Sequence, residues 1–537
     1  MRERLPLGVL LASALTLLAS LFLPWREAHS TGLTITSSQG FGELVKGGSA
    51  VGWVAGAGDV AALLVVAVAL ATVAALRRPE LAPKLPLGSL GAALAYFAAA
   101  VAVEVHALGN LVGGGFTGHP VTPHTTWAYG FYLGAASGAI AGVSGLALRR
   151  SELRRPGAAG DAVAGFLGIA LLVSFLLPWI GQGNLFSRPG IDDPAATLAA
   201  AVLIFGAPRV RRQDRRRWRL PLVTAIAILT AGAASATPFS TVSRYGTWIG
   251  VGCVVLLVAV EAARGWPLRL PVLPRGPAAL ELGAAALLIV ALFLPWQEIS
   301  LTHRSWGTNG WYVVAGAAAG GLCLLLLATA LVPAVENYAL DLAIAVAVFG
   351  SLLGTVFRQN GPILRLGYGA DVGLTAAGIL LVTALLRFKP GPVERTRALA
   401  LAMPLAASVL CVAAIVVPMW FVLPQDWTFQ ATALYYGWFS AAGALLALYL
   451  VRLWALRVSG ARGAGYRLTL APLALLALAA LDLIRFRSGD VVWGAVILVC
   501  LCLLLALLGW IEEHSGLAGV RVPEEIWRVD RLPEPES

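Results

Sequence analysis

The chain has 537 residues, of which 58% are hydrophobic and only 12% are charged, and its mean hydropathy is +0.80. A chain of this composition cannot hide its apolar surface from water by folding on itself, so it predicts a protein of the lipid bilayer and excludes a water-soluble globular protein. The net charge of +11 resides mostly in short connections between apolar segments, which argues against nucleic acid as a partner.

Apolar segments follow one another along nearly the whole chain. A hydrocarbon core of about 30 Å needs roughly 20 apolar residues per helical crossing, so we predict an all-α polytopic membrane protein with about sixteen transmembrane helices. The N-terminal segment has a basic start, but its apolar run is long for a signal peptide, and we expect it to be a retained first span. The spans are predicted at residues 5–24, 51–76, 86–108, 127–148, 161–179, 192–208, 220–237, 245–263, 278–296, 311–332, 338–357, 369–386, 397–420, 436–456, 468–484 and 491–510.

Most of the 39 Lys and Arg residues lie at the N-terminus, in every second connection and in the C-terminal tail. Because basic residues are retained on the cytoplasmic side, both termini are predicted to be cytoplasmic, in the inner (plasma) membrane of a bacterium. The densest basic run, Arg209 to Arg219, is predicted to fix the topology and to contact anionic lipid headgroups at the cytoplasmic face. The contacting residues are expected to be Arg211, Arg212, Arg215, Arg216 and Arg217.

Two short motifs recur along the chain. The first is an apolar helix ending in Leu-Pro-Trp or a variant of it, at Trp25, Trp179, Trp296 and Trp420. The second is Tyr-Gly-x-x-x-Gly, which begins at Tyr129, Tyr245 and Tyr368. The intervals are 117 and 124 residues between the last three tryptophans and 116 and 123 between the tyrosines, which indicates an internal repeat. We predict four four-helix units in one orientation, at 1–150 with long outer loops, 160–264, 276–388 and 396–511, followed by a cytoplasmic tail at 512–537.

A four-helix unit with a tryptophan in its first outer loop resembles the claudin-type tetraspan, and these motifs resemble those of tetraspan membrane proteins of high-GC bacteria. The resemblance implies an extracellular β-fold and a role in cell contact. Claudins pair two cysteines in that first loop, whereas the five cysteines of this chain all lie in apolar segments. We therefore expect neither a disulfide nor a thiolate metal site.

The aromatic and glycine residues of the motifs have structural interpretations. Tryptophans where a helix leaves the hydrocarbon are predicted to be interfacial anchors with their N–H groups toward the headgroups. They are Trp25, Trp53, Trp179, Trp296, Trp311, Trp420 and Trp438. Paired glycines four residues apart share a helix face and are predicted to allow close helix packing. They are Gly130, Gly134, Gly246, Gly250, Gly369 and Gly373.

Ionisable residues within spans are candidates for function. Asp59 lies about 9 Å of helix rise beyond Trp53, and with Glu104 and His106 it forms a candidate intramembrane polar site. Such an acid could bind a cation or carry a proton, or it could be a buried acid that is hydrogen-bonded to a neighbouring helix. His29, His119 and His124, with Glu27 and Glu104 nearby, are weak metal candidates. Their spacing matches no metal motif, and ordinary loop histidines are the alternative.

The sequence contains no P-loop, no HExxH and no nucleophile–base pair, so no catalytic residue and no cofactor is predicted. We expect a non-catalytic structural or accessory subunit of a membrane assembly, with the lipid bilayer and other membrane proteins as partners. One alternative is a transporter or channel for a small solute or ion that works near Asp59. A second alternative is a glycosyltransferase acting on lipid-linked sugars, with Glu27 as its acid.

Overall fold

The computed structural model describes part of the chain, and it divides the whole chain into two compact units, Met1–Leu268 and Arg269–Ser537. The boundary falls in the basic linker between predicted segments 160–264 and 276–388. The described residues are 4–29, 49–51, 56–77, 85–114, 124–148, 159–182, 186–212, 215–235, 242–263, 276–301, 304–331, 341–342, 344–350, 352, 364–387, 418–422, 429–432 and 490–491.

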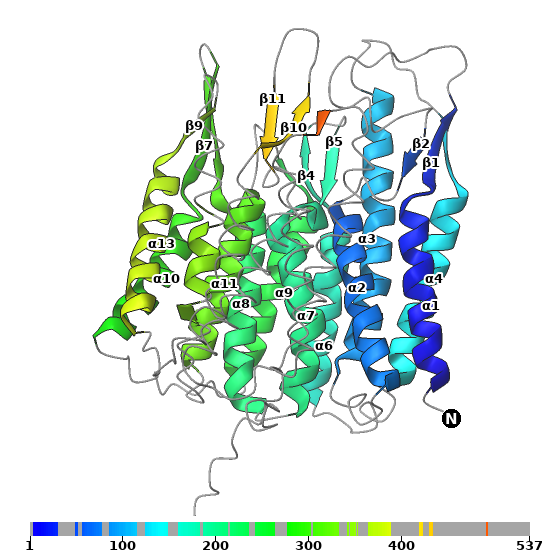
Figure 1. The fold of residues 1–537 in the computed structure, drawn as a ribbon, viewed down its shortest axis with the longest axis horizontal. Helices are drawn as coiled ribbons and strands as arrows, with labels where there is room; N and C mark the ends of the chain where they lie inside the picture. The colour runs from blue at the N-terminus through cyan, green and yellow to red at the C-terminus, as the bar shows by residue number, and fades with distance from the viewer. Residues whose placement is uncertain are drawn as a thin grey trace, which may run out of the picture. The chain divides into compact units, whose positions relative to one another are not determined.

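The described part of the chain is mostly helical, and its helices coincide with predicted spans (Figure 1). In the first compact unit they are α1 (Arg4–Leu21), α2 (Gly56–Arg77), α3 (Leu87–Gly114), α4 (Tyr129–Leu148), α6 (Ala159–Leu176), α7 (Pro194–Arg212), α8 (Arg215–Ser235) and α9 (Tyr245–Ala263). In the second they are α10 (Pro277–Ala291), α11 (Val314–Leu331), a helical stretch within 341–352 and α13 (Tyr368–Arg387).

Five described helices are long and apolar enough to cross a membrane. Their apolar stretches are Val60–Arg77, Leu87–Ala107, Tyr129–Leu148, Tyr245–Ala263 and Tyr368–Arg387, and shorter apolar helices occupy other predicted spans. The mostly helical fold is therefore confirmed, and the five long apolar helices are compatible with a membrane protein, whereas the number of sixteen spans stays a prediction. Three predicted spans, at 436–456, 468–484 and 491–510, lie outside the described residues except for Val491, and so does 397–420 up to residue 417.

The all-α expectation is wrong in one respect, because the connections at one end of the helices form small sheets. Four three-stranded sheets are described, and all have the same order, with the first strand in the middle: β2-β1-β3, β5-β4-β6, β8-β7-β9 and β11-β10-β12. The strands are β1 (Pro24–His29), β2 (Ser49–Val51), β3 (His124–Trp127), β4 (Pro178–Gln182), β5 (Phe186–Pro189), β6 (Val242–Ser243), β7 (Pro295–Leu301), β8 (Arg304–Asn309), β9 (Leu364–Leu366), β10 (Pro418–Val422), β11 (Phe429–Thr432) and β12 (Asp490–Val491).

Each central strand begins at the proline of the first motif, because proline cannot continue the helix. The pairing with the second strand is irregular directly after that proline in all four sheets, between Pro24 and Arg26 and at the equivalent positions of the others. In this register Met419 takes the position of Trp25, so the predicted equivalence of Trp420 with the other tryptophans is off by one residue. Short strands of this kind have no extended alternating pattern that would distinguish them from loops.

In the first three sheets along the chain, one residue separates the end of the third strand from the helix that carries the second motif. Arg26 pairs with Trp127, Ile180 with Ser243 and Gln297 with Leu366, and each partner lies two residues before the tyrosine of the motif. The helices that bear the two motifs also pack together, α1 on α4, α6 on α9 and α10 on α13. Trp179 and Tyr245 thus belong to one helix group, and Trp296 and Tyr368 to the next. The two tryptophans are 117 residues apart, whereas the two tyrosines are 123 apart, so the distance in sequence between these helix groups depends on which motif is measured.

Candidate functional site

The two sequence motifs contact each other inside the protein. Trp25, Trp179 and Trp296 are fully buried, and their rings lie over the second glycine of Gly-x-x-x-Gly. A Cβ atom at Gly250 would lie 2.5 Å from Cζ2 of Trp179, and one at Gly373 would lie 2.5 Å from Cζ2 of Trp296. At Gly130 and Gly246 a Cβ atom would lie 2.5 Å from the main-chain oxygen of Pro24 or Pro178. The first glycine of each pair therefore leaves room for a neighbouring backbone, and the second leaves room for an indole ring.

The indole N–H groups of these three tryptophans stay within the protein. Each donates to the main-chain carbonyl five residues earlier, from Trp25 to Ser20 at 2.8 Å, and at 2.7 Å from Trp179 to Ser174 and from Trp296 to Ala291. The prediction that these N–H groups point to lipid headgroups is thus corrected, because a helix C-terminus supplies carbonyls without intrahelical partners.

The other predicted anchors divide into two sets. Trp311 lies in the turn Gly310–Tyr312 before α11, where it is fully buried and its Nε1 has no hydrogen-bond partner. It therefore does not face the headgroups either. Trp53 and Trp438 lie outside the described residues, and of Trp420 only the backbone position in β10 is described.

Glu104 is the buried acid of the candidate polar site. Its side chain is only 3% exposed, and both carboxylate oxygens accept the backbone N–H of Ala57 at 3.2 Å. Ala57 belongs to the first turn of α2, whose N–H groups have no partners within the helix and carry the positive end of the helix dipole. The structure therefore buries a carboxylate where a helix terminus compensates its charge.

The structure places Asp59 in the same first turn of α2 as Ala57. Asp59 and Glu104 are thus brought to one end of α2, although 45 residues separate them in the sequence. The side chain of Asp59 lies outside the described part, so its role stays a prediction.

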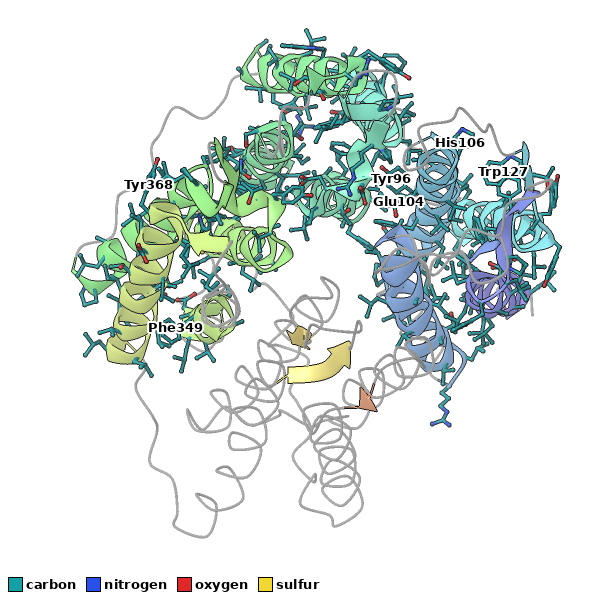
Figure 2. The ribbon with its side chains drawn as sticks, turned by 90° about the horizontal axis from the view of Figure 1, so that it is seen from above. Tyr96, Glu104, His106, Trp127, Phe349 and Tyr368 are labelled. Carbon is teal, nitrogen blue, oxygen red and sulfur yellow. The ribbon has the colours of Figure 1, made fainter. Side chains whose placement is uncertain are left out.

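His106 is not part of this arrangement. Two residues along a helix correspond to a rotation of about 200°, so His106 lies on the other side of α3 from Glu104 (Figure 2). It is exposed and stacks on Trp127, with ring centroids 5.8 Å apart. Trp127 in turn stacks on Phe131 at 4.1 Å. The expected grouping of His106 with the two acids is therefore corrected.

Tyr96 is a polar contact that sequence reasoning missed. It lies about two helical turns before Glu104 on α3, and the two are labelled near each other in Figure 2. Its hydroxyl donates to the main-chain oxygen of Leu172 in α6 at 3.1 Å. This bond joins the predicted segments 1–150 and 160–264, and a lone tyrosine within an apolar run was the available signal.

Two arginine-centred charge clusters were also missed, at the ends of the helices opposite the sheets. In the first, Arg219 of α8 lies 2.8 Å from Asp161 of α6 and 3.7 Å from Glu261 of α9. In the second, Arg387 of α13 contacts Glu281 of α10 directly and lies 3.6 Å from Asp341. The acids and bases are far apart in the sequence, so no local pattern indicates these pairs.

Asp193 is a buried carboxyl directly before α7, which begins two residues later than its predicted span. Its Oδ1 accepts the N–H of Ala195 at 2.8 Å, whereas its Oδ2 is buried without a hydrogen-bond partner. Burial raises the pKa of Asp193 to about 8, against the opposing effect of the N–H groups of Ala195 and Ala196. The side chain therefore holds a proton at neutral pH.

The predicted lipid-contacting arginines lie at the junction of two helices. Arg211 and Arg212 end α7, and Arg215, Arg216 and Arg217 begin α8. Their side chains lie outside the described part, so the contact with anionic lipid stays a prediction.

The metal candidates occupy the sheet beside α1 and α4. His29 in β1 and His124 in β3 are direct partners in the antiparallel register, whereas His119 lies outside the described residues. Among the side chains that the structure describes, no group of three His, Cys, Asp or Glu residues could hold a metal ion.

Comparison of the chain with protein-family models, with curated proteins and with solved structures found no match.

Proposed function

We propose that the chain is a non-catalytic multi-pass membrane protein built from four fused four-helix units, which serves as a structural or accessory subunit of a membrane assembly. The observation that carries the proposal is that polar side chains inside the helix groups contact neighbouring elements of the same fold. The indoles of the three motif tryptophans, the carboxylate of Glu104 and the guanidinium groups of Arg219 and Arg387 are engaged in contacts that join one element to another, as a packing role requires. Polar groups of this kind stabilise a fixed helix arrangement.

The shared sheet construction supports the proposed fourfold duplication. Strand order, the irregularity after proline and the position of the third strand recur in all four sheets, including the one formed by β10, β11 and β12. A small sheet at one end of a four-helix group also supports the proposed likeness to claudin-type tetraspans.

Exposed side chains on α4, α9 and α13 support the proposed place in the bilayer. Each helix has 19 or 20 residues and thus spans about 30 Å, the thickness of the hydrocarbon core. Tyrosine opens each helix at the sheet end, and these tyrosines are 55–59% exposed. Their amphipathic rings suit the outer interface, where the buried motif tryptophans were expected. Large exposed aliphatic residues follow along the helices and include Val143, Leu146, Val255, Leu256, Val382 and Leu386.

A transporter or channel is the second candidate, and one observation favours it. A buried carboxylate, Glu104, meets the turn of α2 that carries Asp59, so two acids occupy one end of that helix. A pair of acids between helices is a reasonable place for a cation or a proton. Nothing in the described residues favours a glycosyltransferase.

Reconstitution of the purified chain into liposomes separates the two candidates. Proton- and sodium-sensitive dyes trapped inside would report flux, and the structural proposal predicts none above protein-free liposomes. Flux that Asp59→Asn abolishes, in a variant that keeps its helix content by circular dichroism, would establish transport and refute the structural role. Flux that survives Asp59→Asn and Glu104→Gln would refute the structural role and also this site for transport.

A further inference from the structure

Two of the helices that begin with the second motif bury small residues and expose large apolar ones. On α4 every buried residue is Gly, Ser or Ala, whereas Val143 and Leu146 are exposed. On α9 Gly250 is buried, whereas Val255 and Leu256 are exposed. In water this sorting would waste the favourable burial of the largest apolar side chains. The exposed face therefore requires an apolar environment.

The exposed residues of α4 form one stripe along the whole helix. The large ones are Tyr129, Tyr132, Leu133, Ile140, Val143 and Leu146. They recur at the spacing of residues that share one face of a helix. The stripe is uncharged, since α4 contains no charged residue, and its 20 residues give the helix a length of about 30 Å. The stripe is therefore as tall as the hydrocarbon core of a bilayer is thick.

Such exposed faces are confined to some of the described helices. α1, α6 and α10, which end near the first motif, also expose large apolar residues, among them Leu15, Phe166 and Val290. Among the described side chains of α3, α7 and α8, in contrast, no large hydrophobic residue is exposed. α3 packs against α2, α4 and α7, and α8 packs against α7 and α9. Helices next to the motifs thus have an uncovered face that these other helices lack.

We infer that lipid acyl chains cover the exposed faces of α1, α4, α6, α9, α10 and α13, which we call the motif helices, and that α3, α7 and α8 are kept from lipid. The inference rests on the proposed function, because it assigns the bilayer itself as the partner of one particular surface. Tyr129, Tyr245 and Tyr368 lie at the sheet end of this surface, and charged Arg219 and Arg387 lie at the opposite end of the helix groups. Aromatic residues, an apolar band and charges follow one another as the layers of a bilayer require.

A second membrane protein fits this surface less well than lipid does. The faces recur in three helix groups, but the side chains at their centres differ, for example Phe166 on α6 and Leu287 on α10. A protein partner would need a different complementary surface for each group, because interfaces between proteins are closely packed. Fluid acyl chains adapt to any apolar shape.

Photolabelling from within the bilayer tests the inference. The full chain is placed in phosphatidylcholine vesicles that contain a phosphatidylcholine with a diazirine in one acyl chain, and peptide mass spectrometry locates the labelled residues after illumination. We expect label on Val143, Leu146, Val255 and Leu256, and on Phe166 of α6. The peptides of α3 and α7 from the same sample are the internal control and should carry no label.

Each other outcome identifies a different failure. Equal labelling of α3, α7 and the motif helices would overturn the assigned surface while leaving the proposed membrane location intact. The absence of label from every helix would contradict the membrane location as well. Label that appears in vesicles but is lost from α4 and α9 in membranes of the producing cells would show that a protein covers them, and lipid would be overturned as the occupant.

One position on α9 separates lipid from a protein partner by substitution. Val255 lies about 15 Å of helix rise beyond Tyr245, near the middle of the hydrocarbon core. Val255→Asp should lower the amount of membrane-integrated protein by about tenfold or more, because a short acidic side chain at this depth cannot reach water. Val255→Leu is the matched control and should have no effect, because acyl chains accept either shape. An unchanged amount of Val255→Asp, or a loss in Val255→Leu, would overturn the contact with lipid.

Discussion

The two ends of the helix groups are built in different ways. At the sheet end, α1–α4, α6–α9 and the group from α10 to α13 share one construction, in which a buried indole lies over a glycine of the last helix. At the opposite end they differ. In α1–α4, Gly91 meets Gly145 so closely that a Cβ atom at Gly91 would lie 2.9 Å from the Gly145 Cα atom. In the other two groups an arginine joins two acids.

The difference between the two ends shows which contacts require particular residues on particular helices. The arginine of the cluster lies on α8 in one group and on α13 in the other, so the positive charge of the ion pair can come from different helices of a group. The contact of an indole with glycine depends on shape, because any Cβ atom at the glycine overlaps the ring. Such a contact tolerates no exchange of roles, and it also fixes the start of two strands.

The largest effect is expected where the arginine is removed from the most buried acid. Arg387→Met leaves Glu281, which is 1% exposed, without its partner, and should lower the free energy of unfolding by about 3–5 kcal/mol. The matched change Arg219→Met should be milder, because Asp161 and Glu261 are 15% and 12% exposed. Unfolding in mixed micelles measures both. The double variant Arg387→Met/Glu281→Gln should recover most of the loss, and no recovery would contradict an electrostatic origin.

Adding a methyl group to a glycine of α9 tests the indole–glycine contact at the sheet end. Gly250→Ala places a Cβ atom against the Trp179 ring and should cost about 1–3 kcal/mol of stability. Gly252→Ala on the same helix has nothing within 4 Å of the new atom and should be neutral or stabilising by up to about 1 kcal/mol. Melting temperatures of the two variants should therefore move in opposite directions or differ clearly. Equal losses would contradict the importance of the indole contact.

The first helix group has no described arginine cluster, and replacing Glu104 measures how much its buried acid contributes to stability. Glu104→Leu leaves the N–H of Ala57 without its acceptor and should cost about 1–3 kcal/mol. His106→Ala, two residues further along α3, should cost less because His106 is exposed. If both changes had equal effects in the same unfolding measurement, the assigned contact with α2 would be wrong.

The smallest effect for a single step in conditions is the pH dependence of stability at the start of α7, which for one proton is at most about 1.4 kcal/mol per pH unit. The equivalent residue before α11 is Val313. The folded pKa of Asp193 is about 8, and an unfolded aspartate titrates near 4. Between these values the folded state holds a proton that the unfolded state has released, so the free energy of unfolding falls as the pH rises through this window. Asp193→Asn should remove this part of the slope. A wild-type minus variant difference in melting temperature that stays constant, or rises with pH, would contradict the raised pKa.

The sequence by itself determined where the helices of the described part lie and where several of them end. Runs of apolar residues are a local property, and proline interrupts a helix whatever its surroundings, so α1, α6 and α10 end close to Leu-Pro-Trp, although a few residues earlier than the predicted spans. The paired glycines could also be read from the sequence, because a missing side chain is a local property, and in the structure other atoms approach them closely.

Only the tertiary structure decided which partners these elements have. Trp179 was expected among the headgroups, but it is buried because Gly250, 71 residues later, leaves room for its ring. Glu104, Arg219 and Arg387 likewise have partners on other helices, and the sheets pair strands that lie far apart in the chain. Such contacts depend on which surfaces folding brings together, and no local pattern of residues encodes that choice.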